Sequence, residues 1–146
     1  MLNKTNAMFP GSFNPIHSGH LDIIKRASKI FNKFYVVVSI NDYKPQKTSC
    51  KVRLANAKKA VDKLHLKNVK VVGNKGLTVQ FAKKHNITVI VRSIRNAQDA
   101  VYEIDMAKAN HSLNNKIETM IMLPKDELTH LSSTALRYLK DAKKRK

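Results

Sequence analysis

Two histidines and a turn rich in special backbone residues lie near the start of this chain. His17 and His20 are three positions apart, so a helical first turn would place both imidazoles on one face. Gly11, a few residues earlier, allows the backbone to approach a ligand closely, and the hydroxyl of Ser12 can donate to a phosphate oxygen. Imidazoles also donate hydrogen bonds to phosphate oxygens. These residue types in this order indicate a site for a phosphate.

The surrounding pattern predicts a strand, a tight turn and the N-terminus of a helix. Residues 5–9 form the expected strand, and apolar positions from Ile23 to Phe31 describe one face of a helix that begins near Ser18. Backbone N–H groups and the positive end of the helix dipole would then point outward, which suits a phosphate. Two other interpretations stay open: ordinary surface histidines, and a zinc-binding pair, which the lack of a neighbouring acidic or thiol ligand disfavours.

The segment from Gly11 to His20 resembles the G-x-F-D-P-x-H-x-G-H signature of the nucleotidyltransferase superfamily. Members of that superfamily join a nucleotide to a phosphorylated acceptor and release pyrophosphate. Phe13 matches the aromatic position, whereas Asn14 replaces the aspartate and so removes a charge. The glycine patterns of dinucleotide-binding and P-loop proteins are both missing here, which excludes those two kinds of phosphate loop.

Later segments resemble the phosphopantetheine adenylyltransferase family, and together the matches cover essentially the whole chain. Residues 92–110 are similar to R-G-[LI]-R-x-x-x-D-x-x-Y-E-x-x-x-A-x-x-N, with Ser93 in place of the glycine. Residues 131–137 look like I-S-S-[ST]-x-[VIL]-[RK], and residues 41–44 look like N-P-x-K. The resemblance implies that ATP and 4'-phosphopantetheine give dephospho-coenzyme A and pyrophosphate. The acceptor phosphate is already an anion, so the protein would act by positioning and charge stabilisation.

The same resemblance implies a role for each site residue. The residues expected to be catalytic are His20, Lys44 and Arg95. The residues expected to bind ATP are Gly11, Ser12, Phe13, His17, His20, Arg95, Glu103, Ser132, Ser133 and Thr134. The residues expected to bind the acceptor are Ser12, Lys44, Thr78 and Arg92. No side chain is expected to ligate a metal, and Mg²⁺ would be held mainly by the ATP phosphates, because these segments are poor in carboxylates.

Two residues of the 92–110 segment also have simpler interpretations. Glu103 could be a carboxylate on a helix surface or at a subunit contact, and Tyr102 could be a core residue. These interpretations stay open beside the ATP-binding role of Glu103.

The charge of the chain favours anionic partners. Lys and Arg number 28 against 10 Asp and Glu, a formal net charge of +18. The basic residues are spread along the chain, including the tail 140–146, and no nucleic-acid-binding signature stands out, so small polyphosphates fit this charge as well as nucleic acid does.

The single cysteine, Cys50, excludes an intramolecular disulfide. Without an apolar run long enough for a signal peptide or a membrane span, we expect a cytoplasmic protein.

Alternating strand and helix patterns predict an α/β fold. Buried apolar, β-branched runs are expected to form further strands at 34–40, 69–72, 88–91 and 119–123. Helical patterns are expected at about 51–64, 78–85, 97–113 and after Ser132 or Ser133. This order predicts a single domain over 1–146, a Rossmann-like doubly wound parallel five-stranded sheet with helices on both faces. Ligands of such sheets bind beyond the carboxyl ends of the strands, where His20, Lys44 and Arg95 would converge.

The partners and the alternatives follow from these matches. The resemblance implies ATP and 4'-phosphopantetheine as substrates, and a homo-oligomer, for which a homohexamer is the family's usual form. One alternative is another nucleotidyltransferase with the H-x-G-H motif, such as a nicotinate-mononucleotide adenylyltransferase, and the 92–110 match is the feature against it. The other alternative is a basic nucleic-acid-binding protein without turnover, which would bind oligonucleotides in a salt-sensitive way and form no product.

Overall fold

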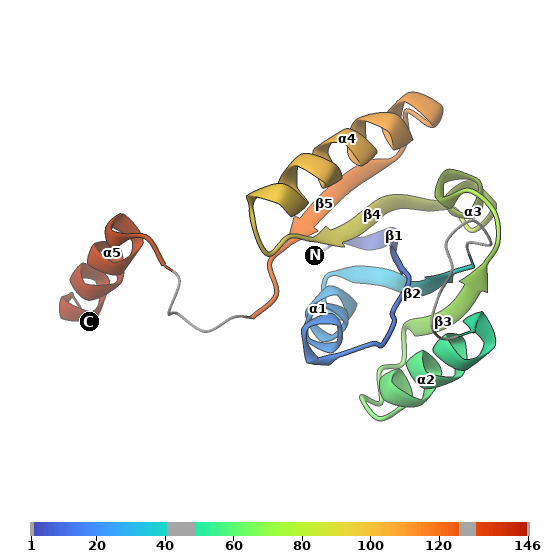
Figure 1. Cartoon of the computed structure of the whole chain (residues 1–146), viewed down its shortest axis with the longest axis horizontal. Helices are drawn as coiled ribbons and strands as arrows, with labels where there is room; N and C mark the ends of the chain where they lie inside the picture. The colour runs from blue at the N-terminus through green and yellow to red at the C-terminus, as the bar shows by residue number, and fades with distance from the viewer. Residues whose placement is uncertain (1, 41–48, 126–130, 146) are drawn as a thin grey trace.

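The computed structural model describes residues 2–40, 49–125 and 131–145. Strands and helices alternate along these residues (Figure 1). The strands are β1 (Leu2–Gly11), β2 (Phe31–Ser39), β3 (Val69–Asn74), β4 (Ile87–Ser93) and β5 (Glu118–Met122). The helices are α1 (Ser18–Ser28), α2 (Cys50–Asp62), α3 (Thr78–Lys84), α4 (Ala97–Leu113) and α5 (Ser133–Lys144).

The strands form one parallel five-stranded sheet in the order β3-β2-β1-β4-β5. The chain runs outward from β1 to β3 on one side, returns past β1, and then continues through β4 to β5. This arrangement confirms the predicted doubly wound, Rossmann-like α/β fold. The strand order reverses between β1 and β4, so the crevice outside the carboxyl ends of these two strands is the expected place for a ligand.

Helices cover both faces of the sheet, as predicted. Alternate side chains of β1 point to opposite faces: Ala7 and Phe9 belong to the cluster that packs against α1 and α2, whereas Met8 packs with Phe81 of α3 on the other face. Figure 1 shows α1 and α2 on one side of the sheet and α3 and α4 on the other. On the first face α1 buries Ile23 and Ile24, which fixes its N-terminus beside the end of β1.

Two boundaries differ from the sequence prediction. The apolar spacing predicts Phe31 on the first helix, but α1 ends at Ser28 and Phe31 begins β2. Phe31 joins the same buried cluster as the helix, so the apolar pattern continues across the boundary. Gly73 is expected to end the third strand, yet β3 runs on to Asn74 because Gly73 pairs with Val38 of β2.

The last helix stands apart from the sheet. Ser132 is its N-cap and accepts a hydrogen bond from the Ala135 N–H, so the predicted cap is confirmed. None of the described residues of α5 is buried, and Figure 1 shows the helix well away from α1 and the strands.

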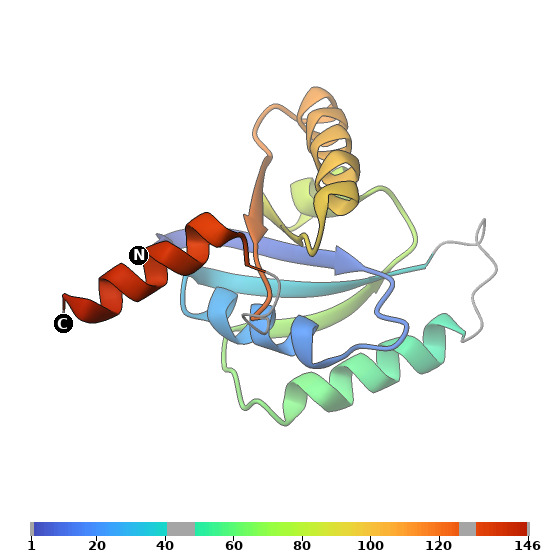
Figure 2. The ribbon, with the colours of Figure 1, turned by 60° about the vertical axis from the view of Figure 1, so that its left-hand side comes forward.

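Figure 2 shows the opposite end of the body, where the arrows of β1 and β2 end at a common edge. Among the described residues, no helix has the length and apolarity needed to cross a membrane.

Candidate active site

The turn between β1 and α1 is closed by the two histidines themselves. His17 is the N-cap of α1, and its Nδ1 accepts a hydrogen bond from the Gly19 N–H at 3.1 Å. The Nδ1 of His20 accepts in turn from the His17 N–H at 3.2 Å. This is a capping box in which imidazoles take the places of the usual hydroxyl and carboxylate. The cap therefore fixes both rings at the helix N-terminus, beyond the carboxyl end of β1.

The same hydrogen bonds decide which ring nitrogen carries the proton. Each Nδ1 accepts from a backbone N–H, so each neutral imidazole holds its proton on Nε2. The two rings are stacked, with centroids 3.8 Å apart and planes inclined by 27°. Each Nε2–H thus remains as a donor for a ligand, on rings that are held rigidly by the cap and by each other.

His20 is set up to stay neutral. Burial, as the largest cause, and the charges of His17, Arg95 and Arg92 together lower the pKa of His20 from 6.5 to about 4. The ring also packs edge-on against Phe13, with centroids 4.9 Å apart. At neutral pH His20 is therefore a fixed, uncharged hydrogen-bond donor at a helix N-terminus.

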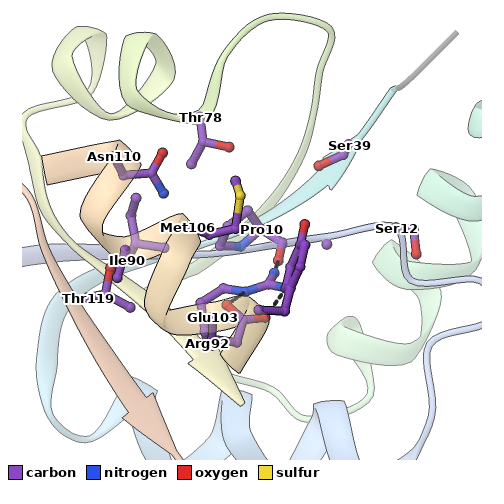
Figure 3. Close-up of a pocket in the computed structure, with 13 residues that line it drawn as sticks. Pro10, Ser12, Ser39, Thr78, Ile90, Arg92, Glu103, Met106, Asn110 and Thr119 are labelled. Carbon is purple, nitrogen blue, oxygen red and sulfur yellow. Dashed lines mark hydrogen bonds and ion pairs between the residues drawn. The ribbon is translucent and has the colours of Figure 1, made fainter. Parts of the chain in front are cut away.

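Arg92, near the end of β4, is clamped by Glu103 of α4. Its Nε donates to Oε2 of Glu103 at 2.8 Å and its Nη2 donates to Oε1 at 2.7 Å, which makes a bidentate pair. Its Nη1 donates to the carbonyl of Pro10 on β1 (Figure 3). Glu103 is only 5% exposed, so it is not a surface carboxylate. Arg92 thereby joins β1, β4 and α4 at the point where the strand order reverses.

Two cavities meet at Arg92. One, of about 300 Å³, extends toward α3 and α4 (Figure 3). The predicted site residues that line it are Gly11, Ser12, Thr78, Arg92 and Glu103. The other, of about 290 Å³, lies at the N-terminus of α1. The predicted site residues that line it are Gly11, Ser12, Phe13, His17, His20, Arg92 and Arg95. The fold thus brings residues from three distant segments to one edge of the sheet.

Arg95 carries an exposed positive charge at this edge of the sheet. Its side chain is 72% exposed, and its Nε lies 3.7 Å from Oδ2 of Asp99 one helical turn later. The same Asp99 oxygen accepts from the Arg95 N–H at 3.0 Å, while Asn96 caps α4 by accepting from the Asp99 N–H. The guanidinium is therefore placed beside the histidine pair and remains open to an anionic ligand from solvent.

The chain is similar to known proteins over nearly its whole length. The model of the cytidylyltransferase-like family matches residues 8–139. The phosphopantetheine adenylyltransferase of Finegoldia magna is 39% identical over 136 residues, which is 93% of this chain and 83% of that protein. The phosphopantetheine adenylyltransferase of Campylobacter concisus is 40% identical over 134 residues, 92% of this chain and 85% of that protein. This chain belongs to the phosphopantetheine adenylyltransferase family.

Solved structures agree on the fold. A putative nicotinate-nucleotide adenylyltransferase from Vibrio parahaemolyticus aligns with a TM-score of 0.58, over 92% of this chain and 84% of that one. Its sequence identity is 17%, so the likeness concerns the fold alone. Membership of the phosphopantetheine adenylyltransferase family makes the chain a nucleotidyltransferase.

Some residues that the family resemblance assigns to the site are not among those that line the cavities at Arg92. Ser132 caps α5, Ser133 and Thr134 begin it, and none of the three lines either cavity at Arg92. Lys44 and the rest of its segment, 41–44, lie outside the described residues. In the part of the chain that the structure describes, no group of three or more His, Cys, Asp or Glu side chains is arranged to hold a metal ion.

The structure also adds lining residues to which the sequence analysis gave no role in the site, although Tyr102 and Asn110 stand in the 92–110 motif. Tyr102, Met106 and Asn110 of α4 line the cavity toward α3, and Tyr102 is largely exposed rather than a core residue. Their spacing could have revealed them, because Glu103, Met106 and Asn110 follow each other by three and four positions and so share one helix face. Lys125, beyond β5, lines the adjoining cavity of about 450 Å³ together with His17 and Arg95, and no sequence pattern pointed to it.

Proposed function

We propose that this protein transfers the adenylyl group of ATP to 4'-phosphopantetheine, which gives dephospho-coenzyme A and pyrophosphate and is a step of coenzyme A biosynthesis. One observation carries the proposal. The clamped Arg92 lies where a cavity lined by His17, His20 and Arg95 meets a second cavity that runs along α4. A phosphate site joined to a second pocket suits two phosphorylated substrates that must meet at their phosphates.

The cavity of about 290 Å³ at the N-terminus of α1, called the phosphate cavity below, would act by charge stabilisation. The acceptor phosphate attacks the α-phosphorus of ATP in line and pyrophosphate leaves, so neither a protein nucleophile nor a general base is required. The Nε2–H of His20 donates to the α-phosphate as charge shifts there, and Arg95 pairs with the phosphates that leave. His17, Gly11, Ser12 and Phe13 hold the triphosphate at the N-terminus of α1, where the helix dipole favours an anion.

The cavity along α4 takes the acceptor. It is lined by polar groups of Thr78 and Asn110 and by the apolar side chain of Met106, with Tyr102 and Arg92 nearer the phosphates. Pantetheine carries amides and a hydroxyl along an otherwise aliphatic chain, and this alternation of polar and apolar wall suits it. Arg92 provides the charge for the acceptor phosphate. We keep Lys44, Ser132, Ser133 and Thr134 as proposed phosphate ligands on the strength of the family motifs.

Magnesium would be held mainly by the ATP phosphates. Among the described residues, the carboxylates that line the adjoining cavity of about 450 Å³ are Asp99 and Glu103, and Glu103 is held by Arg92 in a bidentate pair. A Mg²⁺ ion that keeps most of its ligands from water and phosphate oxygens needs little from the protein.

We also propose a cytoplasmic homo-oligomer that does not use nucleic acid as a partner. Support for assembly comes from α4, where Val101, Ile104 and Leu113 are 63%, 54% and 66% exposed, and from Ile121 of the edge strand β5, which is 40% exposed. Apolar side chains gathered on neighbouring elements often mark a contact between subunits. Light scattering on a size-exclusion column measures the oligomer directly.

The experiment that tests the function offers one acceptor at a time. Pyrophosphate release from MgATP is measured with 4'-phosphopantetheine, nicotinate mononucleotide or glycerol 3-phosphate. Release with 4'-phosphopantetheine alone is the expected result. Release with another acceptor alone would retain the phosphate site and refute the acceptor. No release with any of them, together with tight oligonucleotide binding, would favour the nucleic-acid-binding alternative.

A further inference from the structure

Arg53 is a buried arginine on the first turn of α2, behind the phosphate turn. It is 3% exposed, although arginine is among the residues least often buried. Its Nη1 donates to the carbonyl of Ser12 at 2.7 Å and to the carbonyl of Ser39 at 3.1 Å. Ser12 follows β1 and Ser39 ends β2, and both line the cavity of about 300 Å³. One guanidinium therefore ties together two walls of the proposed site from outside it.

The hydrogen bond to Ser12 sets the direction of the next N–H. The Ser12–Phe13 peptide is trans, and in a trans peptide the C=O and N–H groups point in opposite directions. Because the Ser12 carbonyl faces Arg53, the Phe13 N–H faces away from Arg53 and α2. Ser12 and Phe13 line the cavity of about 290 Å³ with the histidines, whereas Arg53 does not. The Phe13 N–H therefore points away from Arg53, and it belongs to a residue that lines this cavity.

Phe13 needs such support because its backbone is strained. Its φ is 47°, in the left-handed region that bulky L-residues rarely adopt. Conformations of this kind persist only where the surrounding structure holds them, and they cluster at ligand sites. The Phe13 ring is held against Phe9, with centroids 5.4 Å apart, and the peptide before it is held by Arg53. The N-cap of α2, Ser49, which accepts from the Val52 N–H, fixes the turn that carries Arg53.

We propose that Arg53 is a positioning residue for the adenylyl transfer. It holds the Ser12–Phe13 peptide so that the Phe13 N–H faces the ATP phosphates, and it locks this turn to the end of β2. Arg53 does not touch the substrates. The inference rests on the proposed function, since it assigns the Phe13 N–H to ATP. A charged donor suits the task, because hydrogen bonds from a guanidinium to carbonyls are stronger than neutral ones and the two N–H groups of Nη1 reach both carbonyls at once.

The variants Arg53→Lys and Arg53→Met separate positioning from stability. Lysine keeps the charge, but its side chain is one atom shorter, so its Nζ stops short of the place of Nη1 beside the two carbonyls. The matched control is Arg26→Met, because Arg26 likewise donates to a backbone carbonyl, that of Leu123 at 2.7 Å, but lines none of the cavities at Arg92. For Arg53→Lys we expect kcat to fall about 10- to 100-fold, the scale of a small misplacement of a reacting group, with the KM for ATP changed by less than about threefold. Arg26→Met should shift the melting temperature and leave kcat unchanged.

A second readout observes the turn directly. The chain has five phenylalanines, so labelling with ¹⁵N-phenylalanine gives a spectrum of few amide signals, and Phe13→Leu identifies the Phe13 signal. We expect α,β-methylene-ATP with Mg²⁺ to shift the Phe13 amide in the unmodified protein, and this shift to be lost in Arg53→Lys. This measurement does not depend on turnover.

Each result decides the matter. A folded Arg53→Lys protein with unchanged kcat, or with the full Phe13 shift, overturns the proposal. So does an Arg53→Lys protein that cannot fold, because Arg53 would then serve the fold as a whole. If Arg53→Met fails to fold, the results for Arg53→Lys alone test the proposal. If the unmodified protein turns over no acceptor, the proposed function has failed, and the Phe13 amide still reports on Arg53.

Discussion

Replacing His20 by asparagine and by glutamine separates its two hydrogen bonds. Nδ1 of His20 accepts from the His17 N–H at 3.2 Å, and Nε2–H is the donor offered to ATP. The oxygen of an asparagine side chain can reach the place of Nδ1, whereas the nitrogen of a glutamine side chain can reach the place of Nε2. With its pKa at about 4, His20 is neutral at pH 7, so neither neutral amide removes a charge.

The two variants should fail in different ways. His20→Asn keeps the cap and loses the donor, so we expect kcat to fall about 10²- to 10³-fold, the usual cost of removing one preorganised donor to a transition state. His20→Gln keeps a donor and loses the cap, so we expect the free energy of unfolding to fall by roughly 1 kcal/mol, a typical loss for a helix cap. Its kcat should lie well above that of His20→Asn.

Single-turnover rates with excess enzyme measure the chemical step, and urea unfolding measures stability on the same samples. His65→Asn, a change outside the site at a backbone φ of 53° that asparagine tolerates, serves as a control for the handling of both assays. If His20→Asn retained the rate of the unmodified protein, the Nε2–H would not act on the reaction. If both variants lost rate equally while unfolding normally, the assignment of the two nitrogens would be wrong.

Three further predictions concern the same edge of the sheet. Because the pKa of His20 is lowered from 6.5 to about 4, the unfolded chain binds more protons than the native protein between those two pH values. The stability of the protein should therefore fall as the pH drops from about 6.5 to 4, and melting temperatures measured across that range test this prediction. Arg92→Ala should raise the KM for 4'-phosphopantetheine more than the KM for ATP, and equal rises would contradict its assignment to the acceptor. Arg92→Ala also leaves the buried Glu103 without its partner, so it should lower the free energy of unfolding by about 3 kcal/mol. Adding Glu103→Ala to this variant should lower the free energy of unfolding by much less than another ~3 kcal/mol, as measured by urea unfolding.

The general fold could be predicted because it depends on local patterns. Buried β-branched runs separated by amphipathic stretches define the alternation, and the expected helix 97–113 coincides with α4. The motif around His17 and His20 was sufficient to locate the turn between β1 and α1. These signals lie within a few residues of one another, so a single sequence can display them.

What could not be predicted depends on contacts between distant segments. The pair of Arg92 and Glu103 spans the turn from β4 to α4 and follows neither a strand nor a helix period. The burial of Arg53 follows from carbonyls on two other elements, which no side-chain pattern reveals. The amphipathic pattern of α5 predicts a helix but contains nothing about where that helix lies.

The most direct test of the central claim follows the phosphorus atoms. The protein is incubated with 4'-phosphopantetheine and ATP labelled with ³²P at either the α- or the γ-position, and the products are separated. Adenylyl transfer predicts the α-label in dephospho-coenzyme A and the γ-label in pyrophosphate. A γ-label in the pantetheine product, or no label there from either ATP, would contradict attack at the α-phosphorus and with it the proposed function.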